Sequence, residues 1–448
     1  MAAVASAIND ASEDSVEARL RRNDEFGDGT TLDLSYEYLS DTDGVISDDL
    51  LDAIHTNTSV RSLQLEGHII CNLTPEDGQR LFDALGRLPN LQSLFIHNFV
   101  APLPLLTSFL QEARQLKNLT LHTAQLAGRN DAEAISLVNS LRQLTCLEKF
   151  KFSNGVVAGR LSLDMIMAAV SQIQSLEIVE IELEQGGDLS LPTLEALCRC
   201  PQIKELKLWR ITFEPQHVVL VANTLKTNTS LKELELGELG YADHTSESYV
   251  AMADMLRLNS CLENVELMNF SGFDDEGCIA LASAMEENST LRQLNVRGCD
   301  NSIIGSKAAK AIANTFANNT SLKEWSMNSV GIDDEGAAAI AHALKQDNST
   351  LQTMIFQKIV GNTQRAFLAF MGMLQENITL ERVYPEATGE IKVQIDFWIG
   401  LNQLKLRNLQ LNVDAGREEF MDILARNSIH LDRIFYLLLS NPEFIDDE

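Results

Sequence analysis

The chain contains few of the residues that mark disordered linkers or membrane segments. Its 448 residues include only 9 prolines and 24 glycines, which leaves little room for long disordered stretches. No run of about 18 apolar residues occurs, so the sequence predicts no membrane span. The start, MAAVASAINDASEDSVEARL, has neither a basic beginning nor an apolar stretch and predicts no secretory signal. We therefore expect a cytoplasmic protein.

Positive charge is also scarce. The chain has 35 Lys and Arg against 64 Asp and Glu, a formal charge of −29. Such a surface repels phosphate backbones and anionic lipid. We therefore expect neither a nucleic acid nor a membrane as partner, and favour a basic protein. Hydrophobic residues make up 45% of the chain, which is enough for an ordinary globular core.

The cysteines are few, odd in number and scattered, unlike those of a secreted disulfide scaffold. They are Cys71, Cys146, Cys198, Cys200, Cys261, Cys278 and Cys299. Cys198 and Cys200 lack the second pair that a zinc site needs, so we interpret them as buried thiols. Cys146 and Cys261 precede equivalent leucines, and we expect both to pack in the core.

A repeated pattern of apolar-x-x-apolar-x-apolar occupies most of the chain. NTSVRSLQL begins at Asn57, NTSLKELEL at Asn228, NSTLRQLNV at Asn288 and NTSLKEWSM at Asn319. From Val60 to Leu380 the first apolar position returns with a mean period of about 29 residues. Each copy predicts a short strand, and the stretch after it predicts a helix.

Asparagine followed by Ser or Thr precedes many of these strands. The pairs begin at Asn57, Asn228, Asn288, Asn319, Asn348 and Asn377. Their spacing favours a structural role, in which Asn closes a helix and turns the chain into the next strand. Glycosylation is the weaker alternative.

These copies resemble the ribonuclease-inhibitor type of leucine-rich repeat over about residues 30–385. The resemblance implies an α/β solenoid, a horseshoe with parallel strands on its concave face and helices on its convex face. It also implies a protein-binding function. We expect residues 1–30 to form an acidic N-terminal cap, 31–385 the repeat array and 386–448 a helical C-terminal cap, because solenoid ends need covers.

Alternation along each predicted strand places the residues beside the second and third apolar positions on the concave face. The face predicted from the middle repeats is acidic, with apolar side chains among the acids. Six carboxylates on adjacent strands should repel one another there. The candidate partner-binding residues are Ile178, Glu180, Glu182, Glu205, Lys207, Trp209, Glu233, Glu235, Glu266 and Met268. A solvated acidic face without a partner is the plainer alternative.

No catalytic or cofactor motif is present in the sequence. His97 and His122 share one strand position on neighbouring repeats, but two ligands are too few for zinc. We therefore predict no enzyme, no cofactor and no metal.

The sequence favours a monomeric protein-interaction module. A GTPase-activating protein for the nuclear-transport GTPase Ran is the alternative, since such proteins resemble this repeat. They carry a long acidic C-terminal run, whereas this chain ends in FIDDE. A nucleotide-hydrolysis assay with Ran separates the two. A fragment of an immune-type receptor is a third possibility, although no nucleotide-binding domain precedes the repeats here.

We predict that the denatured protein, titrated with a thiol reagent in the absence of reductant and oxidant, shows seven free thiols. Cysteine side chains at i and i+2 of a helix point apart, so even Cys198 and Cys200 should be unpaired. A lower count would contradict this prediction.

Overall fold

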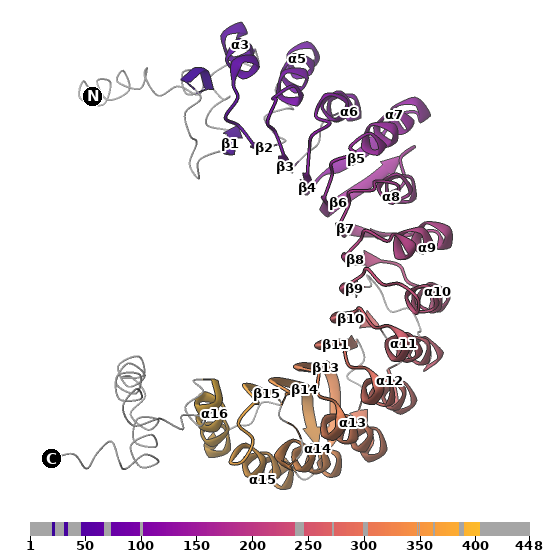
Figure 1. The fold of residues 1–448 in the computed structure, drawn as a ribbon, viewed down its shortest axis with the longest axis vertical. Helices are drawn as coiled ribbons and strands as arrows, with labels where there is room; N and C mark the ends of the chain where they lie inside the picture. Colours follow the sequence, from indigo (N-terminus) through magenta and orange to yellow (C-terminus); the bar gives the residue numbers. More distant parts are fainter. Residues whose placement is uncertain are drawn as a thin grey trace, which may run out of the picture. The chain divides into compact units, whose positions relative to one another are not determined.

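The computed structural model describes the repeat region almost throughout. The residues described are 20–22, 31–34, 46–66, 73–98, 102–237, 246–270, 273–298, 303–346, 348, 350–361, 363–384 and 389–403. The chain divides into two compact units, Met1–Ala242 and Asp243–Glu448. In each unit the strands lie side by side on one flank and the helices on the other (Figure 1). We call the flank with the strands the sheet face.

The first unit alternates parallel strands and helices in chain order. Its main strands are β1 (Thr31–Leu34), β2 (Ser62–Glu66), β3 (Ser93–His97), β4 (Asn118–His122), β6 (Lys149–Gly159), β7 (Ile178–Gly187), β8 (Glu205–Ile211) and β9 (Glu233–Gly237), and β5 (Gln125–Gly128) pairs with β6. Its helices are α3 (Asp48–Thr56), α5 (Pro75–Gly86), α6 (Leu103–Glu112), α7 (Asp131–Arg142), α8 (Leu163–Val170), α9 (Leu191–Arg199) and α10 (Pro215–Leu225).

The second unit repeats this arrangement. Its strands are β10 (Asn264–Phe270), β11 (Gln293–Gly298), β13 (Glu324–Asp333), β14 (Thr353–Val360) and β15 (Arg382–Tyr384), and β12 (Ile303–Ile304) pairs with β13. Its helices are α11 (Ser246–Leu258), α12 (Asp275–Glu287), α13 (Ser306–Asn318), α14 (Asp334–Gln346), α15 (Thr363–Leu374) and α16 (Gly389–Gln403).

The repeat leucines set the register of the strands in both units. Leu63 pairs with Leu94 in the first unit, and Leu294 pairs with Trp325 in the second. The side chains at this position are at most 1% exposed; they are Leu63, Leu94, Leu206, Leu234, Leu294 and Trp325. The predicted α/β leucine-rich-repeat architecture is confirmed.

The repeat asparagines form the turn that the sequence predicts. Oδ1 of Asn319 accepts hydrogen bonds from the backbone N–H groups of Ser321 and Leu322, at 3.0 and 2.7 Å. Its Nδ2 donates to the carbonyls of Met285 and Asn288 in the preceding repeat, at 2.7 and 2.8 Å. One side chain thus ends a helix, starts a strand and links two repeats.

The same geometry recurs wherever a repeat asparagine is described with both bonds. Nδ2 donates to a carbonyl one repeat earlier at Asn228, Asn288, Asn348 and Asn377, at distances of 2.6–2.9 Å. Asn57 and Asn319 are 0% and 6% exposed. A buried amide in these bonds is a structural group, which favours the turn interpretation over glycosylation.

Repeats without this asparagine link to their neighbours through other side chains. Gln115 donates to the carbonyl of Leu88 at 2.7 Å, and Gln202 donates to that of Ile173 at 3.0 Å. The prediction that Cys146 packs in the core is wrong, because Cys146 is exposed. Cys261 is buried as expected, and its backbone N–H donates to Oδ1 of Asn259 at 2.9 Å.

The five described cysteines are free thiols. Cys71 and Cys299 lie outside the described residues. Among the helices that the structure describes, none is long and apolar enough to cross a membrane.

The expected caps fall largely outside the described residues. Within the expected C-terminal cap, Asn402 on α16 donates to the carbonyls of Asn377 and Leu380, at 3.0 and 2.9 Å. The domain boundaries of 1–30, 31–385 and 386–448 remain a prediction.

We predict that Asn319→Ala destabilises the protein by about 2–4 kcal/mol, because it leaves several buried backbone groups without partners. Chemical denaturation monitored by circular dichroism measures the change. Asn318→Ala is the matched control, since Asn318 is exposed and bonds only within its own helix. Equal losses from the two substitutions would contradict the role assigned to the buried amide.

Candidate functional site

The sheet face of β6 to β9 brings most of the candidate residues into three rows across the strands. The first row runs Lys149, Ile178, Glu205, Glu233; the second runs Lys151, Glu180, Lys207, Glu235; the third contains Glu182, Trp209 and Gly237. Residues of one row lie about 4.8 Å from the next strand's residue. Each side chain therefore touches its counterparts from neighbouring repeats.

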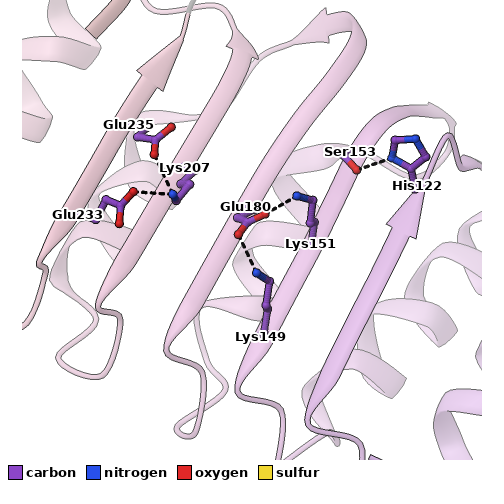
Figure 2. Close-up of polar contacts among 8 residues, drawn as sticks. All are labelled: His122, Lys149, Lys151, Ser153, Glu180, Lys207, Glu233 and Glu235. Carbon is purple, nitrogen blue, oxygen red and sulfur yellow. Dashed lines mark hydrogen bonds and ion pairs between the residues drawn. The ribbon is translucent and has the colours of Figure 1, made fainter. Parts of the chain in front are cut away.

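Glu180 is the centre of one charged cluster (Figure 2). Its two carboxylate oxygens accept from Nζ of Lys149 at 2.8 Å and Nζ of Lys151 at 2.7 Å. The residue is only 8% exposed. Burial acts to raise the pKa of Glu180, but the hydrogen bonds and charges of the two lysines outweigh it and hold that pKa below its ordinary value. Glu180 is thus a structural anion.

Lys207 is the centre of a second cluster (Figure 2). Its Nζ donates to Glu233 at 2.5 Å and to Glu235 at 2.8 Å. Burial acts to lower the pKa of Lys207, yet the two carboxylates raise it well above its ordinary value. The pKa of Glu233 is lowered, since its bonds to Glu235 and Lys207 outweigh its own burial.

The expectation of a field of mutually repelling carboxylates is therefore wrong for three of the six acids. Glu180 is paired with two lysines, and Glu233 and Glu235 share the single ammonium group of Lys207. Burying so many like charges without partners would be unfavourable. Lys149 and Lys151 are the residues that sequence reasoning did not assign to the site, although an offset of one repeat places them beside Glu180.

The remaining acids of the first unit differ. The side chains of Glu182 and Glu205 form no hydrogen bond or ion pair with any residue that the structure describes. Each stands in register with a half-buried apolar side chain: Glu182 with Trp209, and Glu205 with Ile178. The indole Nε1 of Trp209 is buried and has no partner in the described chain. The indole therefore offers ring surface, and its N–H is turned inward.

Glu266 and Met268 belong to β10 of the second unit and are described separately. Glu266 accepts a hydrogen bond from Nδ2 of Asn295 at 3.0 Å. Met268 is half-buried in register with Arg297. Their membership of one surface with the β7–β9 residues remains a prediction.

His97 and His122 meet as their shared strand position predicts. Their rings stack with centroids 5.1 Å apart, and Phe95 stacks on His97 at 6.5 Å. Nδ1 of His122 lies 2.8 Å from Oγ of Ser153. Within the described ranges, no group of three or more His, Cys, Asp or Glu could hold a metal ion.

The fold and its repeat geometry define an α/β leucine-rich-repeat solenoid. A family model described as "Leucine Rich repeat" matches residues 318–341. Mouse (Mus musculus) ribonuclease inhibitor is 23% identical over 309 residues, which cover 62% of this chain and 66% of that protein. The chain thus spans slightly less than two thirds of this relative. The chain is thus similar to leucine-rich-repeat proteins of the ribonuclease-inhibitor type.

One solved structure is also similar in part. "Leiomodin-1 Actin-Binding Site 2 (ABS2)" is 15% identical with a TM-score of 0.23, covering 50% of this chain and 94% of that one. A TM-score this low supports no conclusion about shape or binding.

We predict that Glu180 makes stability depend on pH in the acid range. Its pKa is lower in the folded than in the unfolded chain, so its contribution is complete above the ordinary Glu value and is lost as pH falls through the folded one. Thermal unfolding followed from pH 7 to pH 3.5 should show Glu180→Gln clearly destabilised at pH 7, with the gap to wild type narrowing in acid.

Glu184→Gln is the matched control on the same strand, because Glu184 is exposed and its side chain has no ion pair among the described residues. A gap that stays constant down to pH 3.5 would show that the charge of Glu180 does not matter.

Proposed function

We propose that the chain is a protein-binding module that recognises a basic protein through the sheet face of β7, β8 and β9. The observation that carries the proposal is the pair of carboxylates without ion partners, Glu182 and Glu205, each beside an apolar side chain. The other three acids of this face already hold lysines. Glu182 and Glu205 differ from these three in having no cation bound to the side chain within the described residues.

The pairs formed by Glu182 with Trp209 and by Glu205 with Ile178 fit lysine and arginine side chains. Such side chains have an apolar stem and a charged head. The stem would lie on Trp209 or Ile178 while the head reaches Glu182 or Glu205. A guanidinium placed over the indole would gain a further cation–π attraction, estimated at about 0.5–2 kcal/mol.

The internal ion pairs prepare this surface for binding. Lys149, Lys151 and Lys207 fix the neighbouring carboxylates before a partner arrives. A preformed surface loses less entropy on association than a mobile one. Recognition of this kind requires no cofactor and no chemical step.

The similarity to ribonuclease inhibitor supports the class of function. That relative's name describes inhibition of an enzyme, hence action on a protein target. The net charge of −29 supports a basic partner, because it accelerates association with positive proteins.

A comparison of the proteins retained by immobilised wild type and by an immobilised variant identifies the partner. Wild-type protein and a Glu182→Gln/Glu205→Gln variant are immobilised and exposed to the same cell extract at low salt. Proteins retained by wild type and lost from the variant are the candidates. Asp52→Asn is the control bait, since Asp52 is exposed on α3, away from the sheet face.

We predict that Trp209 and the free acids act on different rates of binding to that partner. Trp209→Ala should weaken binding by about 2 kcal/mol, a roughly 30-fold change in Kd expressed mainly as faster dissociation. Trp209→Phe should retain most of the affinity, because the indole N–H has no partner to lose. Glu182→Gln/Glu205→Gln should slow association several-fold at low salt and little at high salt.

Surface plasmon resonance across a salt series separates these rates. A binding affinity that does not depend on salt, and that neither Trp209→Ala nor Glu182→Gln/Glu205→Gln reduces, would place the site elsewhere on the chain.

A further inference from the structure

The composition of the sheet face differs on the strands that precede β7, the strand that carries Glu180. On β3, β4 and β6 the residues in register across the face include no carboxylate. They are Ser93, Phe95 and His97; Asn118, Thr120 and His122; and Lys149, Lys151 and Ser153. We call these nine residues the β3–β6 patch. None of the nine is acidic, although the chain has 64 acidic residues.

The patch carries an excess of positive charge. Lys149 and Lys151 share the single carboxylate of Glu180, so two cations face one anion. Both lysine side chains are 33% exposed. Figure 2 shows both ammonium groups reaching toward Glu180 from the neighbouring strand, on the same side of the sheet as His122.

The stacked histidines His97 and His122 add hydrogen-bonding groups to the patch. Nδ1 of His97 lies 3.3 Å from the side-chain nitrogen of Asn98, which can only donate, so the neutral ring keeps its proton on Nε2. Nδ1 of His122 is engaged with Ser153. Neither Nε2 atom has a partner among the described residues. Histidines gain positive charge as pH falls between 8 and 5.

The charged groups around the histidines are few. Glu66 on β2 is in register with His97, and Lys151 on β6 stands two residues before Ser153. β3 and β4 present no other titratable group in these rows, and Glu180 on β7 is held by the two lysines. Two protonated rings stacked 5.1 Å apart repel each other. An external carboxylate between their Nε2 atoms would relieve that repulsion.

We propose that the β3–β6 patch is a second docking site, which takes an acidic segment of the partner protein and binds it more tightly as pH falls from 8 to 6. The partner would carry Asp or Glu side chains opposite His97, His122 and Lys151, and basic side chains opposite Glu182 and Glu205. Opposite charges at the two ends of one surface allow a partner to dock in only one direction. The inference rests on the proposed function, because it describes a second contact of the same partner.

Two labelled peptides test the patch without knowledge of the partner. Fluorescence anisotropy at low salt measures binding of a decaglutamate and of a decaarginine to the full-length protein at pH 6, 7 and 8. Decaglutamate should bind about fivefold or more tightly at pH 6 than at pH 8, as expected for charging of the histidines. Decaarginine reports on the β7–β9 surface and should not show this gain.

Variants assign the effect to the patch. His97→Gln/His122→Gln should abolish the gain in decaglutamate affinity at pH 6, and Lys151→Gln should weaken binding severalfold at every pH. His55→Gln on α3 and Lys117→Gln, outside the rows, are matched controls that should behave as wild type. Thermal unfolding checks that each variant is folded.

A second measurement uses the wild-type protein alone, so it does not depend on whether a variant folds. The chain has 8 histidines, so their ring Cε1–H signals in NMR spectra can be resolved, and two of them should shift on addition of decaglutamate.

Binding of decaarginine without any response to decaglutamate would overturn the docking inference and leave the proposed function standing. Failure of decaarginine alone would contradict the proposed function. A decaglutamate affinity gain that persists in His97→Gln/His122→Gln would place the acidic site elsewhere.

Discussion

In the repeats that contain it, one buried asparagine amide sets the register on the preceding repeat, and Gln115, Ser175 and Gln202 make the link in repeats without it. A repeat asparagine satisfies backbone groups in its own turn and in the preceding repeat, as Asn319 does with the Leu322 N–H and the Met285 carbonyl. Helix ends leave carbonyls without partners inside the helix, and their burial is unfavourable unless another donor is present. The asparagine is that donor. Because it bonds on both sides, it sets the step from one repeat to the next as well as the turn.

This step determines the chemistry of the sheet face. Fixed register places residues about one repeat apart on adjacent strands, so the sequence separations between Lys151, Glu180, Lys207 and Glu235 become a row of alternating charge. The carboxylates of that row are satisfied within the protein. Glu182 and Glu205, one step along the same strands, are not. A difference of two residues along a strand thus separates the charges that stabilise the fold from those available to a partner.

Much of this architecture could be predicted from the sequence. The leucine period predicts the parallel strands, and the buried row from Leu63 to Trp325 follows from it directly. The site was harder to predict. The position of a residue along its strand predicts which face of the sheet it lies on. An ion pair also depends on which residues of the adjacent strands lie close enough for their side chains to meet. The ion pairs of Lys149 and Lys151 with Glu180 follow from the alignment of adjacent repeats, which the alternation along a single strand does not give. Cys146 illustrates another failure, since it occupies the same repeat position as the buried Cys261 and is nevertheless exposed.

The buried amides also determine when these asparagines can be chemically modified. A glycosylating enzyme needs the side-chain nitrogen of its acceptor, and in the folded protein the Nδ2 atoms of Asn319 and Asn377 are committed to carbonyls of the preceding repeat. A sugar could reach them only on an unfolded chain, and once attached it would keep two repeats apart. If the protein were directed through a secretory pathway, the fraction of each Asn-x-Ser/Thr site that carries a sugar would depend on folding rate. A repeat that packs slowly against its neighbour would be glycosylated more.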